Sequence, residues 1–511
     1  MKKRLLGAIL ASVLSVSMLA GCGGRQEPVG ETGQSAPAAS SEDNAKEEAT
    51  QATLILYGEA SERMTEFMQN EFRQKVLDEI NVDVTVQYLP WTEYAGGKTE
   101  LMLSTGEKFV TYTDTSFMQK CISKGYYADL TEAAVKYTDD LKKNCGGEEA
   151  FGTWTVDGRL YALPFGNKPN AGENFVVLAR QDILEEVGMS GLSSVEDVER
   201  FYTLAKEKYP EAVGFCACDL NILNAAIPSA VNVYRPNAFI FTDGNKPEDA
   251  SVWSYYESEE YKQACEIVRR WNQMGIIPSY ELSNPSQSAT EFNNGLCLMR
   301  GGANERVFEF GDIVRKAVPD AILKNYYLGD KTKKPMMTRG SYCTAFAVSA
   351  NVEGAELEGY VKLINLLQSS REMVDFMLYG VEGTDYTLND DGTINYINTD
   401  TLFDTWLPAN VNFKRYPSYA TEEMVKDYEN WDEGCIPQKD IGFSFDMTPV
   451  SAEYAQLQAV ESEYIAPISA GFVEYDTAID EAVKKLKEAG IDKFVEEYQR
   501  QFREFMESRV Q

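Results

Sequence analysis

The chain has 511 residues, of which 44% are hydrophobic and 12% aromatic, a composition sufficient to build folded cores. Its 80 acidic residues against 48 basic ones give a formal net charge of −32, which argues against a nucleic-acid partner because no basic face can dominate it. Histidine is absent, so a Ser-His-Asp triad, a Cys-His pair and a His-ligated metal centre are excluded.

The first residues predict export and lipid anchoring. A basic start at residues 2–4 precedes an apolar run over residues 5–19, which is too short for an ordinary membrane-spanning helix. The run ends in Leu19-Ala20-Gly21-Cys22, which resembles the bacterial lipobox. By that resemblance residues 1–21 are a signal peptide and Cys22 carries the acyl chains of a membrane anchor. The alternative is an ordinary signal peptide followed by a chance cysteine.

A tether and a large folded part follow. Residues 22–51 comprise the lipidated cysteine and a stretch of small and polar residues in which Val29 is the one large apolar side chain. Such a stretch cannot bury enough surface to offset its chain entropy, so we expect it to be disordered. The remaining roughly 460 residues exceed what a single core holds and predict two lobes.

The cysteines after Cys22 are expected to be mostly free, buried thiols. Their number is even, but their spacing is too irregular for a disulfide framework. Cys297 and Cys343 lie in apolar, strand-like runs, where a thiol behaves as a small hydrophobe. The Cys216-Ala217-Cys218 spacing is too tight for half of a zinc site, so we expect neither a metal nor a cofactor. The whole set is Cys121, Cys145, Cys216, Cys218, Cys265, Cys297, Cys343 and Cys435.

Short strands alternate with helical segments from residue 53 onward. Strand-like runs cover residues 53–57, 82–89 and 109–112, and helical segments lie between them. The first helical segment is marked by apolar residues at a helical spacing: Met64, Phe67, Met68, Phe72 and Val76. This order predicts an α/β unit with a parallel sheet, and the ligands of such sheets sit beyond the carboxyl ends of the strands.

Two apolar stripes near the end of the chain predict a pair of core-facing helices. Gly490 separates the stripes and ends the first helix. The stripes consist of Ile479, Val483 and Leu486, and then of Ile491, Phe494, Val495, Tyr498 and Phe502. Helices that bind a partner are the alternative, although stripes of this kind normally face a core.

Motifs along the chain resemble those of a known family. Trp154–Pro164 is similar to a DGK-x-YALP hairpin, Phe175–Leu184 to a strand with an R-x-D-x-L turn, and Phe292–Met299 to an F-x-x-GKAAM strand. Further matches follow in the family's order, over Tyr342–Asn351, Val361–Met377, Tyr379–Gly383, Leu388–Tyr396, Gly442–Tyr464 and Lys484–Gln499. Their joint order resembles the large extracellular sugar-binding proteins of ABC importers, in the lipoprotein group common in Gram-positive bacteria. The chain departs from the pattern where the family has Lys-Ala-Ala and this sequence has Leu296-Cys297-Leu298.

The resemblance implies an α/β fold of the periplasmic-binding-protein type. Two α/β lobes with parallel-type sheets are joined by hinge strands, and the ligand cleft lies between the lobes. The implied lobes are residues 52–170 plus 342–385, and residues 171–341 plus 386–511. Chain crossings are expected near Asn170–Asn174, Arg339–Ser341 and Tyr379–Asp385. Ligand capture by hinge closure needs no covalent chemistry, so we do not expect an enzyme.

Candidate ligand-binding residues follow from the chemistry of sugars. A sugar site needs flat aromatic rings for the apolar faces of the sugar and polar side chains for its hydroxyl groups. The ends of the predicted strands supply the candidates Glu59, Trp91, Asp114 and Ser116. The loops near the hinges add Trp154, Tyr234, Arg235, Arg300, Asn304 and Tyr342. The alternative for each aromatic residue is core packing, and for Glu59 and Asp114 it is a helix cap or a solvated loop.

The expected function is that of a solute-binding lipoprotein at the outer face of the cytoplasmic membrane. The protein is expected to act as a monomer. It captures a carbohydrate, by expectation an oligosaccharide, and delivers this ligand to the membrane subunits of an ABC permease. Three alternatives stay open: a peptide or other solute as ligand, an exported glycoside hydrolase built on two carboxylates, and a ligand sensor. Asn389-Asp390-Asp391-Gly392 lacks the closing Glu of a calcium loop and predicts a hairpin turn instead.

Overall fold

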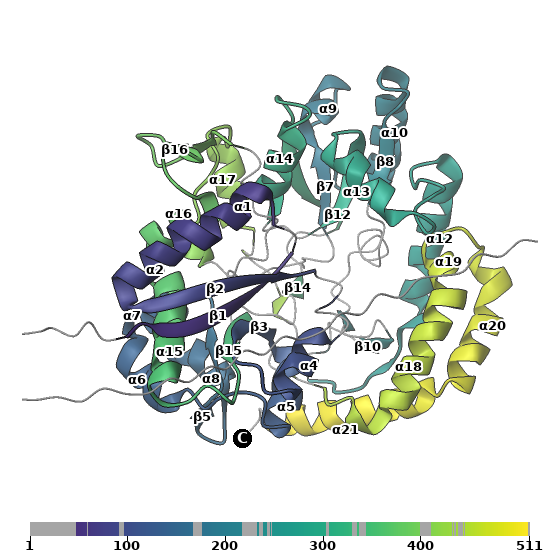
Figure 1. Ribbon diagram of the computed structural model, residues 1–511. Helices are drawn as coiled ribbons and strands as arrows, with labels where there is room; N and C mark the ends of the chain where they lie inside the picture. The colour runs from purple at the N-terminus through teal and green to yellow at the C-terminus, as the bar shows by residue number, and fades with distance from the viewer. Residues whose placement is uncertain are drawn as a thin grey trace, which may run out of the picture. The chain divides into compact units, whose positions relative to one another are not determined.

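The computed structural model describes most of the chain between residues 48 and 508, and its two largest sheets organise the fold (Figure 1). The residues outside the description are 1–47, 59, 91–92, 94–96, 167–175, 217–231, 235–238, 243–245, 247, 303–305, 330–334, 337–343, 399–409, 432, 434–435, 438–442, 444 and 509–511. Cys22, the predicted signal peptide and most of the predicted tether fall in the first of these ranges. No helix among the described residues has the length and apolarity needed to cross a membrane.

The first sheet has its strands in the order β2-β1-β3-β15-β6. Their bounds are β1 (Thr50–Tyr57), β2 (Val82–Leu89), β3 (Val110–Asp114), β6 (Ala162–Pro164) and β15 (Thr344–Val348). β1 pairs in parallel with β2 and β3, as predicted, whereas β15 runs antiparallel to β3 and β6. The sheet is therefore mixed rather than parallel throughout, because β15 begins at the edge where its neighbours end. β1 also begins at Thr50, inside the segment predicted to be tether.

The helix after β1 carries the predicted apolar stripe into the core. It begins after Ser61, whose Oγ accepts a hydrogen bond from the Met64 N–H at 3.0 Å. α1 (Glu62–Phe67), a π-helical segment (Met68–Phe72) and α2 (Arg73–Ile80) follow one another without a break. All members of the stripe are at most 3% exposed, so the prediction is confirmed for Met64, Phe67, Met68, Phe72 and Val76.

Further helices and one hairpin complete the hydrophobic core around this first sheet. The helix predicted over residues 361–377 is two helices, because Ser370 leaves the helical conformation and caps the second one through the Met373 N–H. The hairpin predicted near Trp154 is present as β4 (Thr155–Val156) and β5 (Arg159–Leu160). The helices are α4 (Lys98–Ser104), α5 (Thr115–Ser123), α6 (Thr131–Tyr137), α7 (Asp139–Asn144), α8 (Gly147–Thr153), α15 (Gly354–Ser369) and α16 (Arg371–Tyr379).

The second sheet has the order β13-β7-β12-β8 and is also mixed. β12 pairs in parallel with β8, while β7 runs antiparallel to both β12 and β13. The strands are β7 (Val176–Arg180), β8 (Val213–Cys216), β12 (Cys297–Gly302) and β13 (Leu323–Tyr327). The helices that follow or precede them are α9 (Gln181–Glu186), α10 (Val195–Lys208), α12 (Glu259–Met274), α13 (Pro285–Asn293) and α14 (Val307–Arg315).

A small antiparallel sheet and the closing helices share the core of the second sheet. The small sheet has the order β11-β10-β9, with β9 (Asn232–Tyr234), β10 (Ile240–Thr242) and β11 (Trp253–Ser254). The closing helices are α18 (Ser451–Val460), α19 (Ala466–Ser469), α20 (Tyr475–Glu488) and α21 (Ile491–Ser508), with a π-helical turn (Glu461–Ile465) before α19. Gly490 separates α20 from α21 at φ +96°, as predicted. Most of the two predicted stripes is buried, although Val483 and Val495 are only partly so.

The remaining elements join these cores. β16 (Tyr386–Leu388) and β17 (Ile394–Tyr396) form a hairpin across the turn predicted at residues 389–392, where Gly392 has φ +84°. α17 (Glu422–Glu429) lies against residues that follow β12, and β14 (Pro335–Met336) pairs in parallel with β18 (Ile436–Pro437). Short 3-10 turns cover Tyr255–Glu257, Val411–Phe413 and Thr448–Val450.

Candidate ligand-binding site

The carboxyl ends of four strands meet at one edge of the first sheet. The pairings Tyr57↔Leu89 and Asp114↔Thr344 bring the ends of β1, β2 and β3 level with the start of β15. The pairing of Pro164 with Ala345 adds the end of β6 to the same edge. We call this the first edge, and in α/β sheets it is where ligands sit.

The second sheet has an equivalent edge. Val176, the first residue of β7, pairs with Gly302 at the end of β12 and with Tyr327 at the end of β13. We call this the second edge. Residues 165–175 lead from the end of β6 to the start of β7, and residues 328–343 lead from the end of β13 to the start of β15. Both of these chain crossings therefore connect the first edge with the second edge.

Buried hydroxyl groups hold the strand ends of the first edge in place. The Tyr57 Oη lies 2.7 Å from the Thr99 Oγ1 and 2.9 Å from the Thr111 Oγ1. Burial raises the pKa of Tyr57, so the phenol stays neutral and shares its proton with these two threonines. The Thr113 Oγ1 and the Tyr127 Oη are paired in the same way at 2.8 Å. These residues are absent from the predicted ligand contacts, although Tyr57 and Thr113 lie at strand ends, as Asp114 does.

The structure brings some of the predicted residues to the two edges. Asp114 is the last residue of β3, at the first edge, and its side chain is 5% exposed. Ser116 follows it in the first turn of α5. Arg300 lies in β12, and its guanidinium carbon is 4.2 Å from the ring centre of Phe310 and 5.0 Å from that of Phe292. Arg300 is therefore stacked on aromatic rings of α13 and α14.

Trp154 takes the alternative role of a core residue. Its side chain is 0% exposed and belongs to the core of the first sheet, so it offers no surface to a ligand. The chain turns at the end of α8, where the Trp154 N–H donates to the Phe151 carbonyl, and this turn directs the indole inward. Tyr234 ends β9, and its side chain is outside the description. The other predicted ligand contacts, Glu59, Trp91, Arg235, Asn304 and Tyr342, also lie outside the described residues.

A segment beyond residue 386 packs on the first core, although the sequence assigned it to the second lobe. Asn410 is 0% exposed, and its amide donates to the carbonyls of Asn144 at 3.2 Å and Gln368 at 3.1 Å. The Val411 N–H donates to the Gly166 carbonyl at 2.8 Å, just after β6. No periodic pattern marks this contact, because it is made by single polar groups in an irregular segment.

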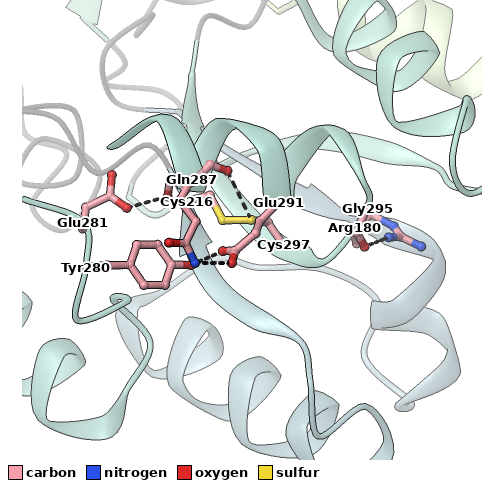
Figure 2. The surroundings of a disulfide bond; sticks show 9 residues. Arg180, Cys216, Tyr280, Glu281, Gln287, Glu291, Gly295 and Cys297 are labelled. Carbon is pink, nitrogen blue, oxygen red and sulfur yellow. Dashed lines mark hydrogen bonds between the residues drawn. A yellow bond between two sulfur atoms is a disulfide. The ribbon is translucent and has the colours of Figure 1, made fainter. Parts of the chain in front are cut away.

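A disulfide joins Cys216 to Cys297, with 6.1 Å between their Cα atoms. The prediction of a free thiol at Cys297 is therefore wrong, because β8 and β12 are neighbours in the sheet although their cysteines lie 81 residues apart. Figure 2 shows Tyr280 and Gln287 turned toward the carboxylate of Glu291 beside this disulfide, and Gln287 donates to it at 2.9 Å. A carboxylate oxygen of Glu291 and the two sulfur atoms lie within 4.8 Å of one another, but sulfurs joined in a disulfide are not the thiolates that bind a metal.

The prediction of free, buried thiols is confirmed for Cys121, Cys145 and Cys265. Burial raises the pKa of Cys145 and of Cys265 to about 12, so both thiols stay protonated at neutral pH and are poor nucleophiles. Cys218, Cys343 and Cys435 lie outside the described residues.

Two hollows among the described residues lie away from both edges. One is a crevice of about 20 Å³ beside α17, lined in part by Leu323, Met424 and Trp431, and it holds at most a single water molecule. The other is an open groove of about 990 Å³ between the π-helical segment and α16, lined mainly by charged and amide side chains. None of the predicted ligand-binding residues lines either hollow.

The fold matches solved structures along nearly its whole length. The N-glycan transport solute binding protein NgtS from Streptococcus pneumoniae superposes with a TM-score of 0.74 at 20% identity, covering 90% of this chain and 99% of that one. Its complex with Man1GlcNAc gives 0.70 at 21% identity, covering 89% and 99%. The alginate-binding protein AlgQ2 without calcium gives 0.61 at 15% identity, covering 89% and 98%. The prediction of an α/β fold of the periplasmic-binding type is thus confirmed.

Sequence comparison leads to the family. A carbohydrate ABC transporter substrate-binding protein from Streptococcus pneumoniae serotype 4 (strain ATCC BAA-334 / TIGR4) is 25% identical over 520 residues, which cover 98% of each chain. Residues 440–507 match a domain of unknown function. Residues 68–328, more than half of the chain, match the model of bacterial extracellular solute-binding proteins, and the chain belongs to this family.

Proposed function

We propose that this protein captures an oligosaccharide outside the cell and delivers it to an ABC permease. The ligand would lie between the first edge and the second edge, on lobes formed by residues 52–170 with 342–385 and by residues 171–341 with 386–511. The observation that carries the proposal is the path of the chain, since residues 165–175 and 328–343 both link one edge to the other. Because Asn410 and Val411 bond to the first core, we propose that this short segment moves with the first lobe.

The names of two relatives support a glycan as ligand, whereas AlgQ2 is named for binding alginate, a polyanionic sugar. One relative is a carbohydrate transporter subunit, and NgtS was solved with Man1GlcNAc and with Man5GlcNAc. A net charge of −32 disfavours polyanionic ligands and leaves neutral sugars unaffected. Oligosaccharides of mannose and N-acetylglucosamine are therefore the first candidates, with Asp114 and Ser116 as hydrogen-bonding partners at the first edge.

Capture would work by population shift. A ligand that contacts both lobes binds the closed arrangement better than the open one and shifts the protein toward it. Moving the population from about 1:99 to 99:1 requires roughly 5.5 kcal/mol of preference for the closed state. The permease then recognises the closed protein, and no bond of the sugar is made or broken, so the protein acts without catalysis.

We also propose that Cys22 carries a lipid anchor and that the protein works as a monomer on the outer face of the cytoplasmic membrane. The basic start, the apolar run and the Leu19-Ala20-Gly21-Cys22 box support this placement. In the native host, the wild-type chain should incorporate labelled palmitate, and Cys22→Ala should not. Incorporation of the label into the variant would contradict lipid anchoring at this residue.

The test of the ligand class is a thermal-shift and calorimetry panel on the full chain in mild detergent. The panel contains Man1GlcNAc, Man5GlcNAc, an anionic uronate oligosaccharide and a mixture of short peptides. A ligand at about 100 times its Kd should stabilise the protein by roughly 2.7 kcal/mol. Stabilisation by peptides with no response to any sugar would overturn the carbohydrate assignment, and cleavage of a bound glycan by the pure protein would overturn the binding role.

A further inference from the structure

The described part of residues 440–507, the range that matches a domain of unknown function, packs directly on the small β11-β10-β9 sheet. The ring of Phe494 on α21 lies 5.6 Å from that of Phe239, the residue before β10, in an edge-to-face arrangement. Phe494 and Tyr498 are 0% and 1% exposed, so this face of α21 is core. Hydrophobic contact of this kind holds the helices against the small sheet but does not by itself determine the position of the sheet.

Gln499 on α21 makes a contact of a different kind. Its Oε1 accepts a hydrogen bond from the Val252 N–H at 2.9 Å, and its Nε2 donates to the Ala250 carbonyl at 2.6 Å. Ala250 and Val252 lie immediately before β11, so one side chain binds the backbone of this loop at two points. A two-point bond to backbone sets position as well as distance, which a hydrophobic contact does not do.

Other polar contacts tie the residues after β11 to the same region. The Tyr256 hydroxyl donates to Glu461 at 2.6 Å, and the Tyr261 hydroxyl lies 2.9 Å from that of Ser469. Lys487 forms an ion pair with Glu257 at 2.9 Å. Every one of these partners belongs to residues 440–507, so three residues that follow β11 are bound to this part of the chain.

The position of β11 is passed on to β9 through β10. Ile240 in β10 pairs with Ser254 in β11 on one side and with Tyr234 in β9 on the other. A shift of β11 along its axis therefore moves the backbone of Tyr234. Tyr234 is one of the residues that the sequence analysis selected for ligand contact.

We infer that residues 440–507 act as a brace that positions the β11-β10-β9 sheet for ligand binding, with Gln499 as its positioning residue. The assignment rests on the proposed function, because it takes β9 to contribute to the site. It gives the domain of unknown function a role in affinity, beyond its contribution to stability.

The chain offers a matched control for Gln499. Gln501, two residues further along α21, binds backbone in the same two-point manner, accepting from the Asp446 N–H at 2.8 Å and donating to the Asp446 carbonyl at 2.9 Å. Asp446 lies inside residues 440–507, so this bond holds the brace to itself and not to the small sheet. Gln499→Met and Gln501→Met each remove a two-point bond to backbone, and Gln501→Met also removes the bond that Gln501 donates to Glu497 within α21 at 2.7 Å.

The experiment measures hydrogen exchange and glycan affinity on both variants of the full chain. In the absence of ligand, Gln499→Met should raise amide exchange in peptides covering residues 239–242 and 250–256, whereas Gln501→Met should raise it only near residues 445–448. Loss of the Gln499 bonds should weaken binding of whichever glycan the wild-type chain binds by about threefold to tenfold, and Gln501→Met should leave that affinity unchanged.

The outcomes separate the brace from the proposed function. Wild-type affinity in Gln499→Met, or an equal loss in both variants, overturns the positioning role. A wild-type chain that binds no glycan refutes the carbohydrate assignment, and the exchange measurement still tests the brace. Unchanged exchange over residues 239–242 in Gln499→Met overturns the brace itself.

Discussion

Arg63 and Asp385 form a two-point ion pair between segments 322 residues apart, with the Nε–Oδ1 distance at 2.9 Å and the Nη2–Oδ2 distance at 2.8 Å. The Asp385 side chain is 1% exposed, and its carboxylate also accepts from the Val381 N–H at 2.8 Å. Gly380, at φ +84°, lies so close that a Cβ there would overlap this carboxylate. The pair thus ties the crossing predicted at residues 379–385 to α1 of the first core.

Breaking this pair should destabilise the protein strongly. In Arg63→Met the buried Asp385 carboxylate loses its counter-ion, which typically costs about 3–5 kcal/mol. Urea unfolding of the variant measures the cost. The matched control is Arg73→Met on α2, because Arg73 binds Asp83 in the same two-point manner but its side chain is 52% exposed. The control should lose far less, because exposed ion pairs contribute little to stability, and an equal loss in both variants would show that burial of Asp385 is not the cause.

The Cys216–Cys297 disulfide should contribute about 2–4 kcal/mol to the free energy of unfolding, because it closes a loop with a sequence separation of 81 residues. Reduction by a thiol reagent should lower the stability of the wild-type chain to that of Cys216→Ser/Cys297→Ser. Among the cysteines that the structure describes, the double variant keeps only the free thiols Cys121, Cys145 and Cys265, so the same reagent should have no effect on it through these residues. Alkylation of the oxidised, denatured protein should leave Cys216 and Cys297 unmodified, and modification of either would contradict the disulfide.

Asp312 on α14 should make stability depend on pH. Burial raises the pKa of Asp312 from 3.8 to about 7, and the nearby Tyr419, Lys414 and Arg315 only partly oppose this effect. Since the folded-state pKa lies above the unfolded one, the contribution to stability is fully present below pH 4 and is lost as the pH rises through 7. Asp312→Asn should therefore gain up to about 4 kcal/mol relative to wild type between pH 4 and pH 8.

Thermal or urea unfolding at several pH values tests this prediction. Asp391→Asn serves as a control of opposite sign, because hydrogen bonds from Thr393 lower the pKa of Asp391. The stabilisation from Asp391 is present at neutral pH and is lost as the pH falls through its lowered pKa. A difference between wild type and Asp312→Asn that does not vary with pH would contradict the prediction.

The sequence predicted those parts of the fold that repeat along the chain. The stripe from Met64 to Val76 was predicted from its helical spacing, and its burial confirms it. The helix break at Gly490 was predicted because glycine tolerates a positive φ, and the break is confirmed. β2 was predicted with its observed bounds because apolar residues alternate along it. The direction of β15 was not predicted, because a strand's own residues do not determine the edge at which the chain enters a sheet.

The parts that failed depend on which elements become neighbours. Nothing near Cys216 in the sequence identifies Cys297 as its partner, since the pairing follows from the strand order β12-β8. A tryptophan suits a sugar site and a hydrophobic core equally well. The turn after α8 places the Trp154 side chain in the core. Asn410 carries no pattern at all, yet it is as buried as any core residue. Single polar contacts of this kind are decided by tertiary structure.

Asp114 offers the most direct test of the first edge as a ligand site. A carboxylate that accepts hydrogen bonds from sugar hydroxyls is worth about 1.5–3 kcal/mol, so Asp114→Asn should weaken glycan binding by roughly tenfold to a hundredfold. Asp157→Asn is the control beside the same sheet, because Asp157 is exposed in the β4–β5 turn and its φ of 51° is tolerated by asparagine. Calorimetry should show unchanged affinity in the control. Unchanged affinity in both variants would show that the ligand does not bind at the end of β3.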